Sequence, residues 1–183
     1  MPDAQILFVG ATSEPWSAIA AQVEADLARL ARPGAELTYR CTGGGPAEIR
    51  NAHDVRLAAP FVVETIVAAG DEGFDAVIVD CTADPGVGEA RELVSIPVVG
   101  AGEALRAAVA MAQQPVVELT GDDLRGMDVP ELVAGLRGAR TVALGGTGFS
   151  HLVEILSTAN PNLVVLDPLS VALDTCLAEL SRD

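Results

Sequence analysis

The sequence predicts an α/β protein whose parallel β-sheets are covered by helices. Half of the residues are hydrophobic and only 3% are aromatic, and such small aliphatic residues suit sheets that are buried on both faces. The apolar, β-branched run 77–79 predicts one buried parallel strand, followed by a turn and a helical pattern. Residues 141–157 repeat this order of strand, glycine-rich turn and helix. Two such units in one chain predict two related lobes that face each other across a cleft.

The other elements alternate between strand and helix along the chain. Pro33-Gly34 ends the first helix, and Gly73 separates a helix from the strand that follows it. Ser13 and Pro15 are typical of the start of that first helix. Strands are predicted at 5–10, 36–40, 74–80, 96–100, 114–120 and from 141, with a last one at 162–166. Helices are predicted from 16 to about 31 and at 55–70, 89–94, 102–112, 151–157 and 168–180, with one more from 130.

Composition and charge exclude several functions. A formal net charge of −15 disfavours nucleic acids and anionic membrane surfaces as partners. No apolar run approaches the length of a membrane span, and the first ten residues lack the basic region of a signal peptide. The three cysteines, Cys41, Cys81 and Cys176, are widely spaced, which is typical of reduced thiols in a cytoplasmic protein. No cluster of cysteine and histidine predicts a metal site.

Cys81 is the first candidate for chemistry because it directly follows the strand at 77–80. Ligands of open α/β sheets bind at the carboxyl ends of the strands. A helix that starts just after Cys81 would favour anions there, including a thiolate, and would lower the thiol pKa. A small buried cysteine without a chemical role remains the alternative.

Two motifs extend this interpretation to a family. The segment Cys81-Thr-Ala-Asp-Pro-Gly86 has the form C-x-x-D-P-G, and the stretch 96–104 has the form I-P-V-V-G-x-G-E-A. Together with Leu144-Gly145-Gly146-Thr147-Gly148, they resemble the cofactor-independent aspartate/glutamate/hydantoin racemase superfamily. The resemblance covers nearly the whole chain and is weakest at 118–140. Gly146 stands where that superfamily's second cysteine would be expected.

The resemblance implies two pseudo-symmetric lobes with parallel sheets, the second of them truncated. Residues 1–97 and 166–183 would form the first lobe, and 98–165 the shortened second lobe. It also implies that two cysteines, one thiolate and one thiol, move protons on opposite faces of a carbon next to a carbonyl. Here only Cys81 is in position, so the chemistry is expected to be one-faced.

The remaining candidate residues follow from the same resemblance and from their positions after strands. Thr12 and Ser13 either cap a helix or hold a substrate carboxylate, and glycine at 146 serves either a one-faced site or a tight turn with positive φ. The full set of expected substrate-binding residues is Thr12, Ser13, Thr82, Ala83, Gly146 and Thr147. Candidates for a second acid are His151, Cys41, His53 and Asp80. Strand alternation should point Asp80 away from the face that carries Cys81, which argues against it.

Three functions are consistent with these features. The first is a decarboxylase or isomerase that protonates one face of an enolate. The second is a racemase or epimerase of an amino acid or hydantoin with a second acid other than cysteine. The third is a non-catalytic relative that binds a small acid or supports a partner protein. In each case we expect a small-molecule carboxylate, amino-acid derivative or hydantoin as ligand, no cofactor, and a homo-oligomer.

Overall fold

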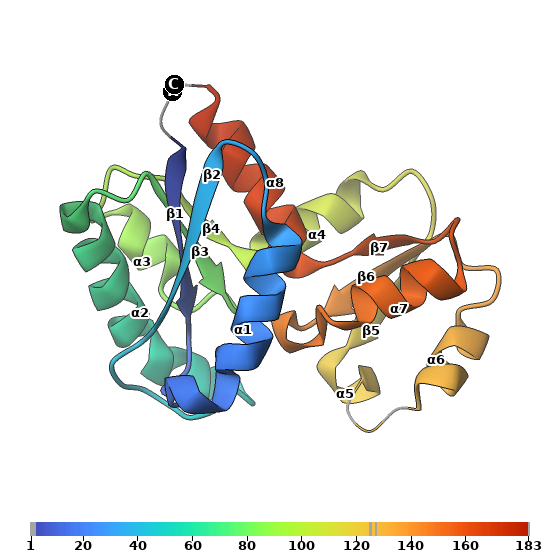
Figure 1. Cartoon of the computed structure of the whole chain (residues 1–183). Helices are drawn as coiled ribbons and strands as arrows, with labels where there is room; N and C mark the ends of the chain where they lie inside the picture. Colours follow the sequence, from blue (N-terminus) through green and yellow to red (C-terminus); the bar gives the residue numbers. More distant parts are fainter. Residues whose placement is uncertain (1–2, 125, 127, 183) are drawn as a thin grey trace.

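The computed structural model describes residues 3–124, 126 and 128–182, which form two lobes, each built around a parallel sheet (Figure 1). The first sheet has the strand order β2-β1-β3-β4, and the second has the order β5-β6-β7. Every strand pair is parallel. The α/β class and the two lobes predicted from the sequence are therefore confirmed.

The first sheet is buried on both faces. It consists of β1 (Ala4–Gly10), β2 (Ala35–Cys41), β3 (Ala76–Asp80) and β4 (Val98–Gly100). Side chains alternate between two apolar cores, with Ile78 in one and Val77 and Val79 in the other. This double burial explains why the β3 sequence is continuously apolar rather than alternating.

Helices cover both faces of that sheet (Figure 1). The core on one side takes residues from α1, α4 and α8, and the core on the other side takes residues from α2 and α3. These five helices are α1 (Trp16–Leu30), α2 (Ala52–Glu72), α3 (Val87–Arg91), α4 (Ala101–Met111) and α8 (Pro168–Leu180). The helices of the second lobe are α5 (Gly121–Leu124), α6 (Val129–Gly135) and α7 (Leu152–Ala159).

The second lobe is smaller. Its sheet consists of β5 (Val116–Thr120), β6 (Thr141–Gly145) and β7 (Val164–Leu166). Helices α6 and α7 pack on it through an apolar core that includes Val142, Leu144 and Leu156. A single 3₁₀ turn, Thr147–Phe149, connects β6 to α7. None of the described helices is long and apolar enough to cross a membrane.

The boundary between the lobes differs from the expected one at residue 98. Val98 pairs with Val77 of β3, so β4 is part of the first sheet. Ala101 and Ala104 of α4 are buried in the core of the first lobe. The first lobe therefore continues through β4 and α4, because these residues bury their apolar side chains against β3 and α8 rather than against the second sheet.

The expected cap of the first helix is also wrong. Pro15 precedes α1 and no side chain caps it. The Ser13 hydroxyl instead donates to the Gly45 carbonyl at 3.0 Å. Gly45 belongs to the glycine-rich loop 43–45, which packs closely on α2, since a Cβ at Gly44 would collide with the ring of Phe61. Gly44 therefore serves packing, whereas Gly45 has a positive φ of 103°.

Candidate active site

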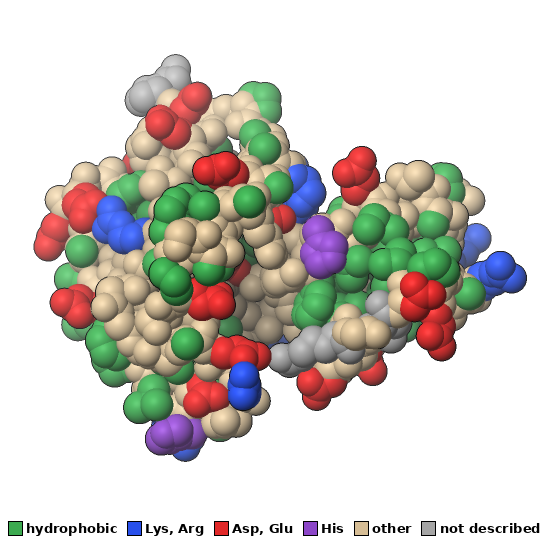
Figure 2. Space-filling view, turned by 60° about the horizontal axis from the view of Figure 1, so that its bottom comes forward, with side chains coloured by type: hydrophobic (Ala, Val, Ile, Leu, Met, Phe, Trp, Pro, Cys, Tyr) green, Lys and Arg blue, Asp and Glu red, His purple; other side chains and the backbone are tan. Residues whose placement is uncertain are grey.

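A cleft of about 380 Å³ lies between the two lobes, and Figure 2 shows the hollow that it forms. Its lining comes from the segments that follow β1, β3 and β6, and from one face of α1. Carboxyl ends of parallel strands are the usual position of ligand sites in α/β folds. Among the residues considered for the site, those that line the cleft are Thr12, Asp80, Cys81, Thr82, Gly146 and Thr147.

The turn after β3 touches the turn after β6. The Thr82 hydroxyl donates to the Gly145 carbonyl at 3.4 Å. Cys81 and Gly146 are the chain neighbours of these two residues, so the lobes bring the two predicted motifs together across one cleft. A small substrate held there would contact both turns.

Asp84 holds the Cys81 turn in place. Its backbone has a positive φ of 51°, and its carboxylate accepts from the Gly102 amide at 2.8 Å and from Arg106 at 2.7 Å. A Cβ at Gly102 would collide with the Thr82 carbonyl. The D-P-G and G-x-G-E-A motifs are therefore two halves of one contact, in which α4 supports the turn that carries Cys81.

The Cys81 thiol keeps its proton at neutral pH. Burial raises the pKa of this thiol to about 11, and the Asp80 and Asp84 carboxylates add to the effect, whereas the amides of Ala83 and Asp84 oppose it. The sequence suggested a lowered pKa from a helix N-terminus. That expectation is wrong in direction, because α3 begins only at Val87. A protonated thiol in this cleft is a proton donor rather than a base.

We expect alkylation to report this protonation state. Iodoacetamide reacts with the thiolate, so its rate at Cys81 should rise about tenfold per pH unit and still be rising at pH 10. Peptide mass spectrometry after timed quenching measures that rate. The matched control is the urea-unfolded chain, where the rate at Cys81 should level off near the ordinary thiol pKa of about 8.5. A plateau near pH 8.5 in the folded protein would contradict the raised pKa.

The position of Asp80 corrects a second expectation. Asp80 does alternate with its neighbours along β3, but it also lines the cleft. The strand ends at Asp80, and the Cys81 amide donates to the Val79 carbonyl at 2.9 Å in a tight turn. Both Asp80 and Cys81 therefore reach the cleft, because it opens across the strand end rather than along one face of the sheet.

Gly146 is not needed for the turn. Its φ of −162° is extended backbone that any residue adopts, so the alternative of a tight turn with positive φ is wrong. A Cβ at this position would lie 3.0 Å from the Phe149 ring. Glycine thus lets the Phe149 ring approach the backbone closely, and the cleft wall formed by residue 146 is backbone without an acid or base.

Several expected site residues do not line the cleft, namely Ser13, Ala83, Cys41, His53 and His151. The imidazole groups of His53 and His151 belong to exposed residues near the starts of α2 and α7. Cys41 ends β2, the edge strand of its sheet. Within the described residues, no group of three or more histidine, cysteine, aspartate and glutamate side chains could hold a metal ion.

The sequence did not single out three lining residues: Glu14, Asp26 and Tyr39. Asp26 shares one face of α1 with Ile19 and Val23, at helical spacing, and a carboxylate on the same face as these apolar residues was a usable signal. Burial raises the pKa of Asp26, although Arg29 opposes it. No comparable pattern marks Tyr39.

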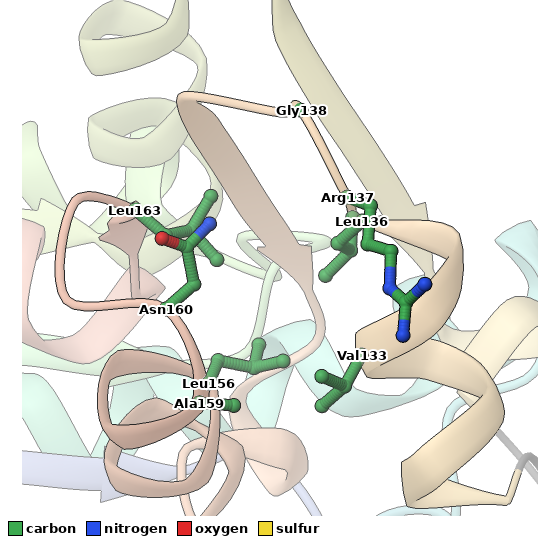
Figure 3. A pocket seen from close by; sticks show the side chains of 8 residues that line it. All are labelled: Val133, Leu136, Arg137, Gly138, Leu156, Ala159, Asn160 and Leu163. Atoms are coloured by element: carbon green, nitrogen blue, oxygen red, sulfur yellow. The ribbon is translucent and has the colours of Figure 1, made fainter.

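A second cavity, of about 320 Å³, lies between α6 and α7 in the second lobe. Figure 3 shows Val133 and Arg137 facing Leu156 and Asn160 across it. Apart from Arg137, its described lining has no titratable side chain, and a guanidinium does not give up its proton to act as a base at neutral pH. The cleft with Cys81 is therefore the better candidate for proton transfer.

Fold and cleft together define a class: a two-lobed α/β protein with a cysteine at a strand end between the lobes. The model of the Asp/Glu/hydantoin racemase family matches residues 10–122, more than half of the chain. The chain belongs to this family. The matched segment includes Cys81, whereas the turn at 145–148 lies beyond it.

Individual proteins also resemble this chain, one of them in sequence and others in fold. A segment of 59 residues is 44% identical to hydantoin racemase from Pseudomonas sp. (strain NS671), but it spans only 32% of this chain and 24% of that protein. Allantoin racemase from Klebsiella pneumoniae has the same fold, with a TM-score of 0.82 at 21% identity, over 98% of this chain and 89% of that one. A variant of arylmalonate decarboxylase superposes with a TM-score of 0.68 at 13% identity, over 97% and 92%.

Proposed function

We propose that this chain is a cofactor-independent enzyme that uses the Cys81 thiol to deliver a proton to a carbon next to a carboxylate or amide carbonyl. The observation that carries the proposal is the position of Cys81, a protonated thiol in the cleft directly beside the second-lobe turn. Membership of a family of racemases supports it.

The proposed reaction begins when a bond to the α-carbon breaks and leaves its electron pair as an enolate: the group that leaves is CO₂ in a decarboxylation, or a proton that water accepts in an isomerisation. The S–H bond of Cys81 then breaks, its proton forms the new C–H bond, and the resulting thiolate regains a proton from water. Hydrogen-bond donors near the carbonyl oxygen stabilise the enolate. Backbone amides of the two turns and the Thr147 hydroxyl are among the donors that the cleft offers.

The cleft favours a substrate with little negative charge. Four carboxyl side chains are among its described lining: Glu14, Asp26, Glu48 and Asp80. Arg29 and Arg50 pair with Asp26 and Glu48, but no lysine or arginine is among the described lining to hold a doubly charged malonate. Isomerisation of an uncharged amide or of an amino-acid derivative therefore fits the cleft better than decarboxylation of a dianion.

A racemase or epimerase is the second candidate. The match to hydantoin racemase favours it, but racemisation needs an acid or base on both faces of the carbon. Cys41, His53 and His151 do not line the cleft, and Asp80, which does, is held by the Tyr39 hydroxyl on the same strand end as Cys81, so none of these candidates is placed to act on the second face without movement. One-faced chemistry by Cys81 requires no such movement.

Exchange of substrate protons in D₂O tests the proposal. Amino acids, hydantoins and malonates are incubated with the enzyme, and NMR follows loss of the α-proton or appearance of deuterated product. We expect exchange with at least one uncharged amide or amino-acid derivative. If no compound exchanges, the proposal fails, and the chain is better described as a protein that binds a small acid without catalysis.

Gly146→Cys tests the one-faced chemistry. Wild type should give a product of single configuration, and the variant should introduce or raise racemisation, because a thiol then stands on the opposite cleft wall. Phe149 must move by a few tenths of an ångström to admit the new side chain. Chiral chromatography of product made in D₂O measures the outcome.

Gly148→Cys is the matched control for that variant. Gly148 also lines the cleft, and a Cβ there would meet no atom within 4 Å. It lies two positions along the turn, so we expect its product to keep the wild-type configuration. An equal mixture of enantiomers from wild type would show that a second acid already operates.

A further inference from the structure

The cavity between α6 and α7 is apolar and separate from the cleft. Three of its lining residues, Leu136, Leu156 and Leu163, belong to the core of the second lobe and are at most 7% exposed. Val133 and Ala159 complete its apolar lining. None of the described residues that line this cavity also lines the cleft. The volume of about 320 Å³ is at the lower end of the range of ligand sites, about 300–1,000 Å³, so a ligand that fills it is small.

Two polar side chains face each other across this cavity (Figure 3). Arg137 follows α6, and Asn160 follows α7. Arg137 makes no ion pair and no side-chain hydrogen bond with any described residue, although the chain has 26 acidic and only 11 basic residues. This guanidinium is therefore available to a ligand.

Asn160 adds a second donor on the opposite side. Its Oδ1 accepts from the Asn162 amide at 3.3 Å, which directs the amide nitrogen, Nδ2, away from that contact. Nδ2 donates to no group within the described part of the chain. The described lining contains no carboxylate, so the polar groups of this cavity favour an anion.

These features define the chemistry of a ligand. A guanidinium stays charged at neutral pH, and its planar fork matches the two oxygens of a carboxylate. One cation suits one negative charge, whereas a phosphate dianion needs more than a single guanidinium. The apolar walls give water few hydrogen-bond partners, so an apolar group that replaces water there binds favourably.

We propose that this cavity is a second ligand site, which binds a small monocarboxylic acid with an apolar tail. The carboxylate accepts hydrogen bonds from Arg137 and from Nδ2 of Asn160, and the tail packs on Leu136, Leu156 and Leu163. The site takes no part in the proposed reaction at Cys81. It stands or falls independently of that reaction.

Backbone amide NMR of the intact ¹⁵N-labelled protein, titrated with sodium hexanoate, tests the site. We expect saturable shifts in α6, in α7 and at 136–138 and 160–163, with a Kd on the order of millimolar. 1-Hexanol has the same tail without the charge and should bind at least about fivefold more weakly. The proposal is overturned if no shift saturates, if saturable shifts are confined to the cleft at 80–82 and 145–148, or if hexanol binds as tightly as hexanoate.

Arg137→Gln should weaken hexanoate binding by at least about fivefold and leave hexanol binding unchanged. Arg140→Gln is the matched control, because Arg140 is also exposed and without an ion pair among the described residues, but does not line the cavity. It should leave both affinities unchanged. An equal loss of hexanoate binding in the two variants would show that only net charge matters and would overturn the proposal.

Ala159→Leu tests the place of the tail. Ala159 is exposed and lines the cavity, so a larger side chain there should fill part of the space and weaken both ligands. The amide spectrum of each variant shows whether it is folded. Unchanged binding in a folded Ala159→Leu would contradict the proposed position. Cys81→Ala should bind hexanoate at α6 and α7 with wild-type affinity, which separates this test from that of the proposed reaction.

Discussion

Replacement of Cys81 by alanine is expected to lower kcat/KM by at least about 10³-fold while the protein stays folded. General acid–base groups contribute roughly 10²–10⁴-fold to rates, and in the proposed reaction Cys81 supplies the proton that forms the new C–H bond. The turn that carries Cys81 is held by Asp84, Gly102 and Arg106, whose contacts do not involve the thiol. Proton exchange in D₂O and thermal unfolding measure the two effects.

Cys41→Ala is the matched control for that replacement. Cys41 follows a neighbouring strand but does not line the cleft, so its removal should change kcat/KM by less than about threefold. Cys81→Ser, which keeps the shape but offers a much weaker acid, should be as inactive as Cys81→Ala. Full turnover by Cys81→Ser would show that the thiol takes no part in the reaction.

Asp167→Ala is expected to have the largest effect on stability. Asp167 is 1% exposed and accepts from Ser150 at 2.5 Å, from Arg29 at 3.0 Å and from the Ser170 amide at 3.0 Å. The substitution takes an acceptor from three donors at once and leaves the Ser170 amide without its side-chain acceptor, which costs about 3–5 kcal/mol of the free energy of unfolding. Urea denaturation measures this loss.

The exposed ion pair between Arg32 and Asp174 provides the control. Its atoms are 2.9 Å apart, but the Asp174 side chain is 66% exposed, so Asp174→Ala should cost less than about 1 kcal/mol. Equal losses from the two variants would show that Asp167 does not stabilise the fold through its buried contacts. Because Arg29 belongs to α1 and Ser150 precedes α7, Asp167→Ala should also loosen the contact between the lobes.

Local patterns were sufficient for the secondary structure and for the family. The apolar run of β3 is buried on both faces, and the C-terminal helix was expected at 168–180 and is observed as Pro168–Leu180. Such elements are predictable because periodicity and helix-ending residues act within a few positions of one another. Domain boundaries were less predictable, since Val98 and Ala101 are equally apolar whichever lobe they join.

The predictions that failed depended on contacts between distant segments. Ser13 was expected to cap the first helix, but its hydroxyl donates a hydrogen bond to the Gly45 carbonyl instead. Gly146 is the exception: it resembles a turn glycine, yet its backbone is extended and its neighbour, Phe149, is only three residues away. No pattern within a single strand reveals that the Tyr39 hydroxyl lies against Asp80.

The sequence by itself determined the class of fold, the family and the placement of Cys81 after a strand, because each depends on residues adjacent in the chain. Only the tertiary structure decided the protonation of Cys81 and the position of Asp80. A thiol pKa depends on burial and on carboxylates brought near by folding. The reach of Asp80 depends on where the strand stops and the cleft opens, and neither property is encoded in the alternation of β3.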